Sequence, residues 1–121
     1  MAATPTTSVS PTGLITWKDT DLDATVVAIK ASSAVISLID VDNSNNGAAT
    51  YLCIWNSTAT ITIGTTVPDL VIIVPASTHI SLPIPAGLTL GTGVQVACKT
   101  TGGTSGSTGP TSDVPVTIIY T

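Results

Sequence analysis

Short runs of β-branched and aliphatic residues, separated by turn-forming residues, recur along most of the chain and restrict its fold more than any other feature. Several runs alternate apolar and polar residues, and a period of two is typical of a β-strand with one buried face. We expect eight or nine short strands, within residues 25–30, 34–42, 50–56, 59–63, 69–74, 79–82, 88–90, 94–99 and 114–120. Residues 14–17 are expected to form a further short strand or an anchor.

Helix signals are scarce, because no stretch combines a period of 3.6 residues with helix-capping residues. Strong helix formers are also rare, since the chain has no Glu, no Arg, one Met and one Gln. We therefore expect an all-β protein, an antiparallel β-sandwich of jelly-roll-like type.

The N-terminal segment differs from the rest of the chain in composition. Residues 1–13 are poor in apolar side chains and carry two prolines, which predicts an extended N-terminal arm. We divide the chain into an arm and lead-in, residues 1–24, and one β-sandwich domain, residues 25–121. Within the domain, residues 100–113 are rich in Gly, Ser and Thr, which predicts an exposed tip or a linker that a partner orders.

Charged side chains are unusually few. Three Lys and seven Asp make up 8% of the chain, against about 25% in typical domains. The net charge is −4, and since neutralising phosphates needs clustered Lys and Arg, we expect no nucleic-acid partner. No segment resembles a signal peptide or a membrane span of about 20 apolar residues, so we expect no membrane partner. Because so few charges protect a monomer poorly from association, we expect a homo-oligomer.

The acidic residues include one arrangement that is typical of metal sites. Asp19, Asp21 and Asp23 form a D-x-D-x-D triplet, a spacing that can supply oxygen ligands to Ca²⁺. The chain lacks the Gly and the Glu that a calcium loop needs after such a triplet, so we expect a solvated acidic lead-in and no metal. Asp40 and Asp42 are expected to form the polar shoulder of a hairpin, with an Asx turn.

The remaining candidate side chains do not form a catalytic motif. His79 is the only histidine, no G-x-S-x-G motif is present, and we expect this residue on the surface or at a strand edge. Cys53 and Cys98 are expected to be free thiols in a reducing cytoplasm, and a disulfide between them is the alternative. Asn56 begins a glycosylation sequon, which we expect to be unused without a secretory signal. We expect no catalytic, cofactor-binding or metal-binding residue and no enzymatic activity.

The aromatic residues are too few for a sugar-stacking platform, so we expect them in core packing or subunit contacts. They are Trp17, Tyr51, Trp55 and Tyr120. The strand patterns also predict a buried set that includes Ile54, Val71, Ile73, Ile80, Val96 and Ile118.

A series of strand and turn motifs punctuates the chain from Thr50 onward. The motifs are YLCIWN at 51–56, GTTVP at 64–68, Pro75, PAGL at 85–88 and VPVTIIY at 114–120. The series, which covers over half of the chain, resembles a pattern in small virion structural proteins of tailed bacteriophages. Cys53 and Trp55 depart from that pattern, in which a polar residue and Tyr are usual.

The resemblance implies a β-sandwich with a structural role in the virion. The first interpretation is a capsid decoration (cement) protein, made in the host cytoplasm, that sits as a homotrimer on the capsid surface and clamps neighbouring copies of the major capsid protein. The alternative is a head- or tail-fibre module for host-surface recognition, although residues 100–113 lack the Trp, Tyr and Asn that favour a recognition tip. A third and weaker interpretation is a small carbohydrate-active or metal-dependent enzyme.

Overall fold

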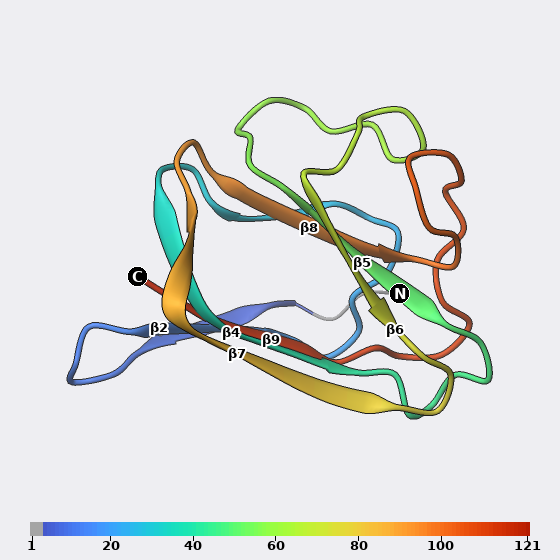
Figure 1. Ribbon diagram of the computed structural model, residues 1–121, viewed down its shortest axis with the longest axis horizontal. Helices are drawn as coiled ribbons and strands as arrows, with labels where there is room; N and C mark the ends of the chain where they lie inside the picture. The colour runs from blue at the N-terminus through green and yellow to red at the C-terminus, as the bar shows by residue number, and fades with distance from the viewer. Residues whose placement is uncertain (1–3) are drawn as a thin grey trace.

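The computed structural model describes residues 4–121, in which nine strands form two antiparallel sheets packed as a β-sandwich (Figure 1). This confirms the expected all-β class. The strands are β1 (Thr6–Val9), β2 (Ile15–Asp19), β3 (Val27–Lys30), β4 (Ala34–Asp42), β5 (Thr50–Trp55), β6 (Leu70–Val74), β7 (His79–Leu90), β8 (Val94–Lys99) and β9 (Val116–Tyr120). Across this described range, no helix has the length and apolar character needed to cross a membrane.

The strand order is that of a jelly roll. One sheet has the order β1-β2-β9-β4-β7 and the other has the order β3-β8-β5-β6. From β2 onward each strand crosses to the opposite sheet, except that β5 and β6 pair as neighbours. Eight strands arranged in this way form the two Greek keys of a jelly roll, and β1 adds one strand beside β2.

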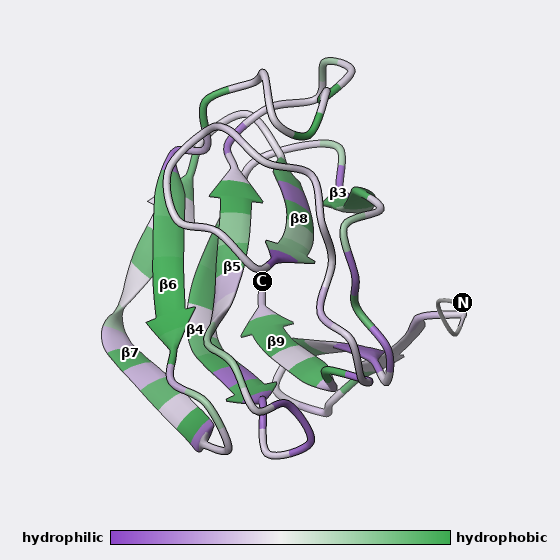
Figure 2. Cartoon of the chain, turned by 90° about the vertical axis from the view of Figure 1, so that its right-hand side faces the viewer, coloured by the Kyte–Doolittle hydropathy of each residue, from purple (hydrophilic) through white to green (hydrophobic). Residues whose placement is uncertain are grey.

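The core lies between the two sheets and consists almost entirely of aliphatic side chains. Figure 2 shows hydrophobic residues concentrated along β4, β5, β6 and β9. Burial of each Val, Ile or Leu contributes roughly 1.5–3 kcal/mol, so this layer is the main source of stability. Its fully buried members include Ile36, Ile39, Val41, Leu52, Ile54, Val74, Val96, Val116 and Ile118.

The prediction of the buried core residues is correct on β5, β8 and β9, but on β6 it selects the wrong face of the strand. Ile54, Val96 and Ile118 are fully buried, as predicted. On β6, however, Ile73 is 61% exposed and Val71 lies on the outer face, whereas Ile72 packs against the core. Every residue of β6 is apolar, so the sequence pattern contains no information on which face is buried.

A β-bulge alters the expected alternation of β4. Simple alternation would place Val35 on the same face as Ile39, but the pairing of β4 with both β7 and β9 shifts register around Ser37. The extra residue reverses the side-chain direction, so Val35 turns to the outer face. Opposite the bulge, Gly87 has φ of +78°, and a Cβ there would lie 2.5 Å from a methyl carbon of Val35.

The sandwich begins earlier than the expected boundary at residue 25. β2 pairs with β9 along its whole length, and Trp17 is only 3% exposed in the core. Burying a Trp removes roughly 150–250 Å² from water, which is enough to hold this segment on the sheet. The exposed part of the expected arm is β1, which forms a hairpin with β2 that projects from the body (Figure 1). Residues 1–3 of that arm lie outside the described range.

Two expected strand boundaries also change. No strand forms at residues 59–63, because β6 takes the position beside β5 and leaves that segment in a loop. The two short strands expected between residues 79 and 90 are one strand, β7, which continues through Pro83 and Pro85. A proline is tolerated there because β7 is an edge strand and one of its sides needs no N–H donors.

Candidate interaction surface

The outer face of the four-stranded sheet is covered by the loop of residues 56–69, which crosses the top of Figure 1. Trp55 is buried under this loop and its Nε1–H donates to the carbonyl oxygen of Thr66 at 3.1 Å. The sequon residue Asn56 anchors the start of the loop, because its Oδ1 accepts the N–H of Thr92 at 2.8 Å. A second, smaller cluster therefore forms outside the sheet, from Cys53, Trp55 and Ala97 with Val26, Ile61, Ile63 and Val71.

The aromatic side chains contribute to packing, as the sequence predicted. Trp17, Trp55 and Tyr120 are all buried. Tyr51 is half-buried beneath Gly102, where a Cβ would come within 3.0 Å of the Tyr51 ring. None of these four rings is left as an exposed platform on which a sugar could stack.

Residues 100–113 are mostly exposed, as one of the two sequence-based expectations had it, but part of this loop is held by the chain itself, which neither expectation included. Lys99 is 1% exposed, and its Nζ donates to the carbonyl oxygens of Thr104 at 2.9 Å and Ser105 at 3.2 Å. Hydrogen bonds from a charged donor are among the stronger ones in proteins. The ammonium group therefore holds the loop back against the sheet. A lysine at the end of a mostly apolar strand was the available sequence signal.

The three carboxylates of the aspartate triplet do not converge. Asp19 is buried, its Oδ1 accepts the N–H of Asp21 at 2.9 Å, and its Oδ2 has no partner within residues 4–121. Asp23 Oδ1 accepts the N–H of Thr25 at 2.8 Å. Burial, followed by the neighbouring Asp113 carboxyl group, raises the pKa of Asp21. Among the described residues, no three or more His, Cys, Asp or Glu side chains are arranged to hold a metal ion.

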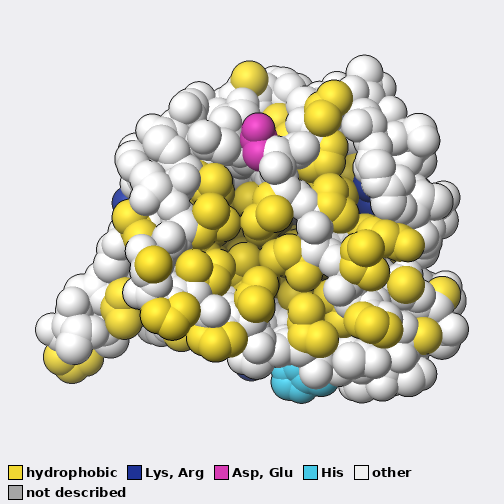
Figure 3. Space-filling view, viewed as in Figure 1, with side chains coloured by type: hydrophobic (Ala, Val, Ile, Leu, Met, Phe, Trp, Pro, Cys, Tyr) yellow, Lys and Arg dark blue, Asp and Glu magenta, His cyan; other side chains and the backbone are white. Residues whose placement is uncertain are grey.

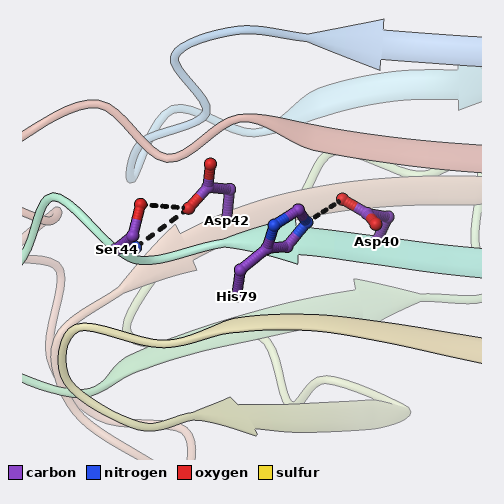
Figure 4. Close-up of polar contacts among 4 residues, drawn as sticks. All are labelled: Asp40, Asp42, Ser44 and His79. Atoms are coloured by element: carbon purple, nitrogen blue, oxygen red, sulfur yellow. Dashed lines mark hydrogen bonds and ion pairs between the residues drawn. The ribbon is translucent and has the colours of Figure 1, made fainter.

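His79 lies on the surface at the start of β7, where it bonds to the neighbouring strand β4 (Figure 4). Its Nε2 is 2.7 Å from Asp40 Oδ1, and this hydrogen bond raises the pKa of His79. Asp42 forms the expected Asx turn, with its Oδ1 accepting the N–H of Ser44 at 3.0 Å and the hydroxyl at 2.5 Å. Those two bonds lower the pKa of Asp42. Both aspartates thus stabilise the end of the β4–β7 ladder.

Both cysteines are free thiols, and they lie on opposite faces of the same sheet. Cys53 belongs to the outer cluster, whereas Cys98 belongs to the main core. Since side chains on opposite faces of a sheet point apart, the alternative of a disulfide between them is not realised. Burial raises the pKa of both thiols, with the Lys99 charge partly opposing this at Cys53.

A groove of mixed polar and apolar lining lies at one end of the sandwich, between the β4–β5 turn and the end of the long loop. Its volume is about 330 Å³. Much of its polar lining is already bonded within the chain, since Asn46 donates to the carbonyl oxygen of Ser112 at 3.1 Å and accepts its N–H at 2.8 Å. The lining includes Asn45, Asn46, Thr100, Pro110, Thr111 and Ser112.

The most distinctive surface is an apolar face along the edge strands β6 and β7. Hydrophobic side chains gather at the centre of this side of the molecule (Figure 3). Ile73 is 61% and Leu82 is 42% exposed, and neither strand carries a charged residue between positions 70 and 74 or between 80 and 90. The half-buried members are Leu70, Val71, Ile72, Ile80, Ile84 and Leu88. Apolar patches of this kind mark interaction sites in soluble proteins.

Comparison with known proteins found no family model, no curated protein and no solved structure that matches this chain. The apolar face and the sequence motifs are therefore the features that bear on the function of this protein.

Proposed function

We propose that this protein is a structural component of a bacteriophage virion, a capsid decoration (cement) protein on the outside of the icosahedral head. The observation that carries the proposal is the charge-free apolar face of β6 and β7, which suits a protein that functions by being packed against others. The jelly-roll topology supports it, since this fold recurs in viral capsid proteins. The motifs between residues 50 and 121 point to the same class.

In this role the protein is made in the host cytoplasm and works as a homo-oligomer, for which the sequence favours a trimer, bound to the major capsid protein. It stabilises the shell by mass action, because it binds the assembled shell and not its dissociated subunits. Such a role needs no catalytic residue, no cofactor and no membrane or nucleic-acid contact.

The direct test is to add purified protein to expanded heads that lack it. We expect saturable binding and a higher temperature of head disruption. With only three Lys and seven Asp, the contact is mainly apolar and hydrogen-bonded, so occupancy should change little from low salt to molar salt. Heads that are equally heat-resistant without the protein would remove the cementing role, and steep loss of the protein with salt would mean electrostatic attachment.

A second candidate function is a head- or tail-fibre module that recognises the host surface. The observation that favours it is the groove of about 330 Å³, because jelly rolls also occur in lectin domains. Titration with host surface glycans separates the two functions. Saturable glycan binding that is lost in a Thr111→Trp variant, together with no binding to heads, would favour the fibre module.

A further inference from the structure

β6 is an edge strand without the features that usually protect sheet edges. Folded proteins guard such edges with prolines, lysines, bulges or short strands, because an open edge pairs with other chains. β7 carries Pro83 and Pro85, β3 carries Lys30 next to a register shift, and β1 has only four residues. β6, by contrast, is hydrophobic along its whole length (Figure 2). Among the edge strands of residues 4–121, β6 is the one longer than four residues that carries no proline, lysine or register shift.

We propose that β6 pairs antiparallel with β6 of a second copy, about a two-fold axis that passes beside Ile72. The two four-stranded sheets then join as one continuous sheet across the dimer. This inference rests on the proposed function only for the self-association of the chain, and it replaces the trimer that the sequence favours with a dimer.

The composition of β6 fits this register. With Ile72 at the axis, Leu70 lies opposite Val74 of the second copy and Val71 lies opposite Ile73. Core-facing residues then meet core-facing residues across the axis, whereas a shift by one residue would mix the two faces. The 61% exposed Ile73 becomes covered on the outer face.

The charge of the face is also suited to a second copy. The face carries no charge between positions 70 and 74 or 80 and 90, so it does not repel a copy of itself.

Symmetry favours two copies over three. A two-fold contact uses the same patch on both partners, whereas a ring of three needs two different patches that fit each other. Pairing one strand edge with itself is a two-fold contact, and the other edges are protected. The pairing therefore gives a dimer, with the β7 strands brought alongside each other over the open side of the core.

Light scattering at micromolar concentration tests the pairing. We expect the wild-type protein at twice its 12.1 kDa, and the variant Ile73→Lys at 12.1 kDa with an unchanged circular dichroism spectrum. Val67→Lys is the matched control, because Val67 is 69% exposed on a loop and should leave the dimer intact. A wild-type monomer or trimer, or a folded Ile73→Lys variant that remains dimeric, would overturn the pairing.

A cross-link tests the register. Residues directly opposite each other in an antiparallel pair have Cβ atoms about 4.5–5.5 Å apart, so Ile72→Cys should form a disulfide-linked dimer under mild oxidation. The control variant Val67→Cys should form little disulfide-linked dimer. If Ile72→Cys remains a monomer after oxidation, the proposed axis is wrong. Head binding separates this inference from the proposed function. A trimer that binds heads would support the decoration role and contradict the β6 pairing. A dimer that does not bind heads would support the β6 pairing and contradict the decoration role.

Discussion

Replacement of Asn43 by Asp should be strongly destabilising, although the two side chains have almost the same shape. Asn43 is fully buried at the end of β4, where it joins the two sheets. Its Nδ2 donates to the carbonyl oxygens of Ala48 at 3.0 Å, Val74 at 3.2 Å and Pro75 at 3.0 Å. Its Oδ1 accepts the hydroxyl of Thr50 at 2.7 Å. An aspartate keeps the acceptor and loses both donors.

The expected loss follows from the number of groups left without a partner. The amide has two N–H bonds for these carbonyls, and each buried acceptor without a donor costs about 1–3 kcal/mol. The new carboxylate also faces carbonyl oxygens in a buried site, which raises its pKa. We expect a loss of about 3–5 kcal/mol at pH 7, a large part of the roughly 5–15 kcal/mol of a typical domain.

The pH dependence has a definite sign. In the variant Asn43→Asp, the folded-state pKa of the new carboxyl group lies above its unfolded value of about 3.9, so the protonated form is favoured in the folded state. A protonated carboxyl group can donate one hydrogen bond, so part of the lost stability returns at low pH. That part disappears as the pH rises through the folded-state pKa.

Urea unfolding, followed by the fluorescence of the two buried tryptophans, measures these effects. The matched control is Asn45→Asp, which makes the same chemical change at an exposed position of the same turn. If the free energies of unfolding of Asn43→Asp and of this control differ by less than about 0.5 kcal/mol at pH 7, the loss of the buried donors is not destabilising and the prediction is wrong. Equal destabilisation at pH 4 and pH 7 would contradict the electrostatic part of the argument.

Three further predictions concern other parts of the sandwich. Ile118→Ala should lower the free energy of unfolding, measured in urea, by about 2–5 kcal/mol. Ile119→Ala should lower it clearly less, because Ile118 is fully buried and Ile119 is not. Lys99→Met should speed amide hydrogen exchange in residues 100–108 far more than in the strands, since it removes the charged donor that holds the loop. An NMR titration should give His79 a pKa above 6.5, and this pKa should fall in the variant Asp40→Asn. The His79–Asp40 pair stabilises the folded state below the unfolded-state pKa of His79, and this stabilisation is lost as the pH rises through the folded-state pKa.

The apolar face could be anticipated from the sequence only in part. The run of five aliphatic residues at Leu70–Val74 predicted a strand, and its composition suggested a buried one. Its place at a sheet edge depends on strand order, which brings β5 to one side of β6 and leaves the other side open. Since strand order arises from contacts between distant segments, no local pattern encodes it.

Local sequence alone determined the class of the fold and the position of most strands. Alternating apolar residues on β8 and β9 predicted both the strands and their buried faces, because one face of each strand is clearly more apolar. The tertiary structure decided the phase of β6, the bulge at Ser37, the entry of β2 into the sheet and the folding of residues 100–113 onto Lys99. A period of two allows two opposite faces, and only the neighbouring strands and the core decide which of them is buried.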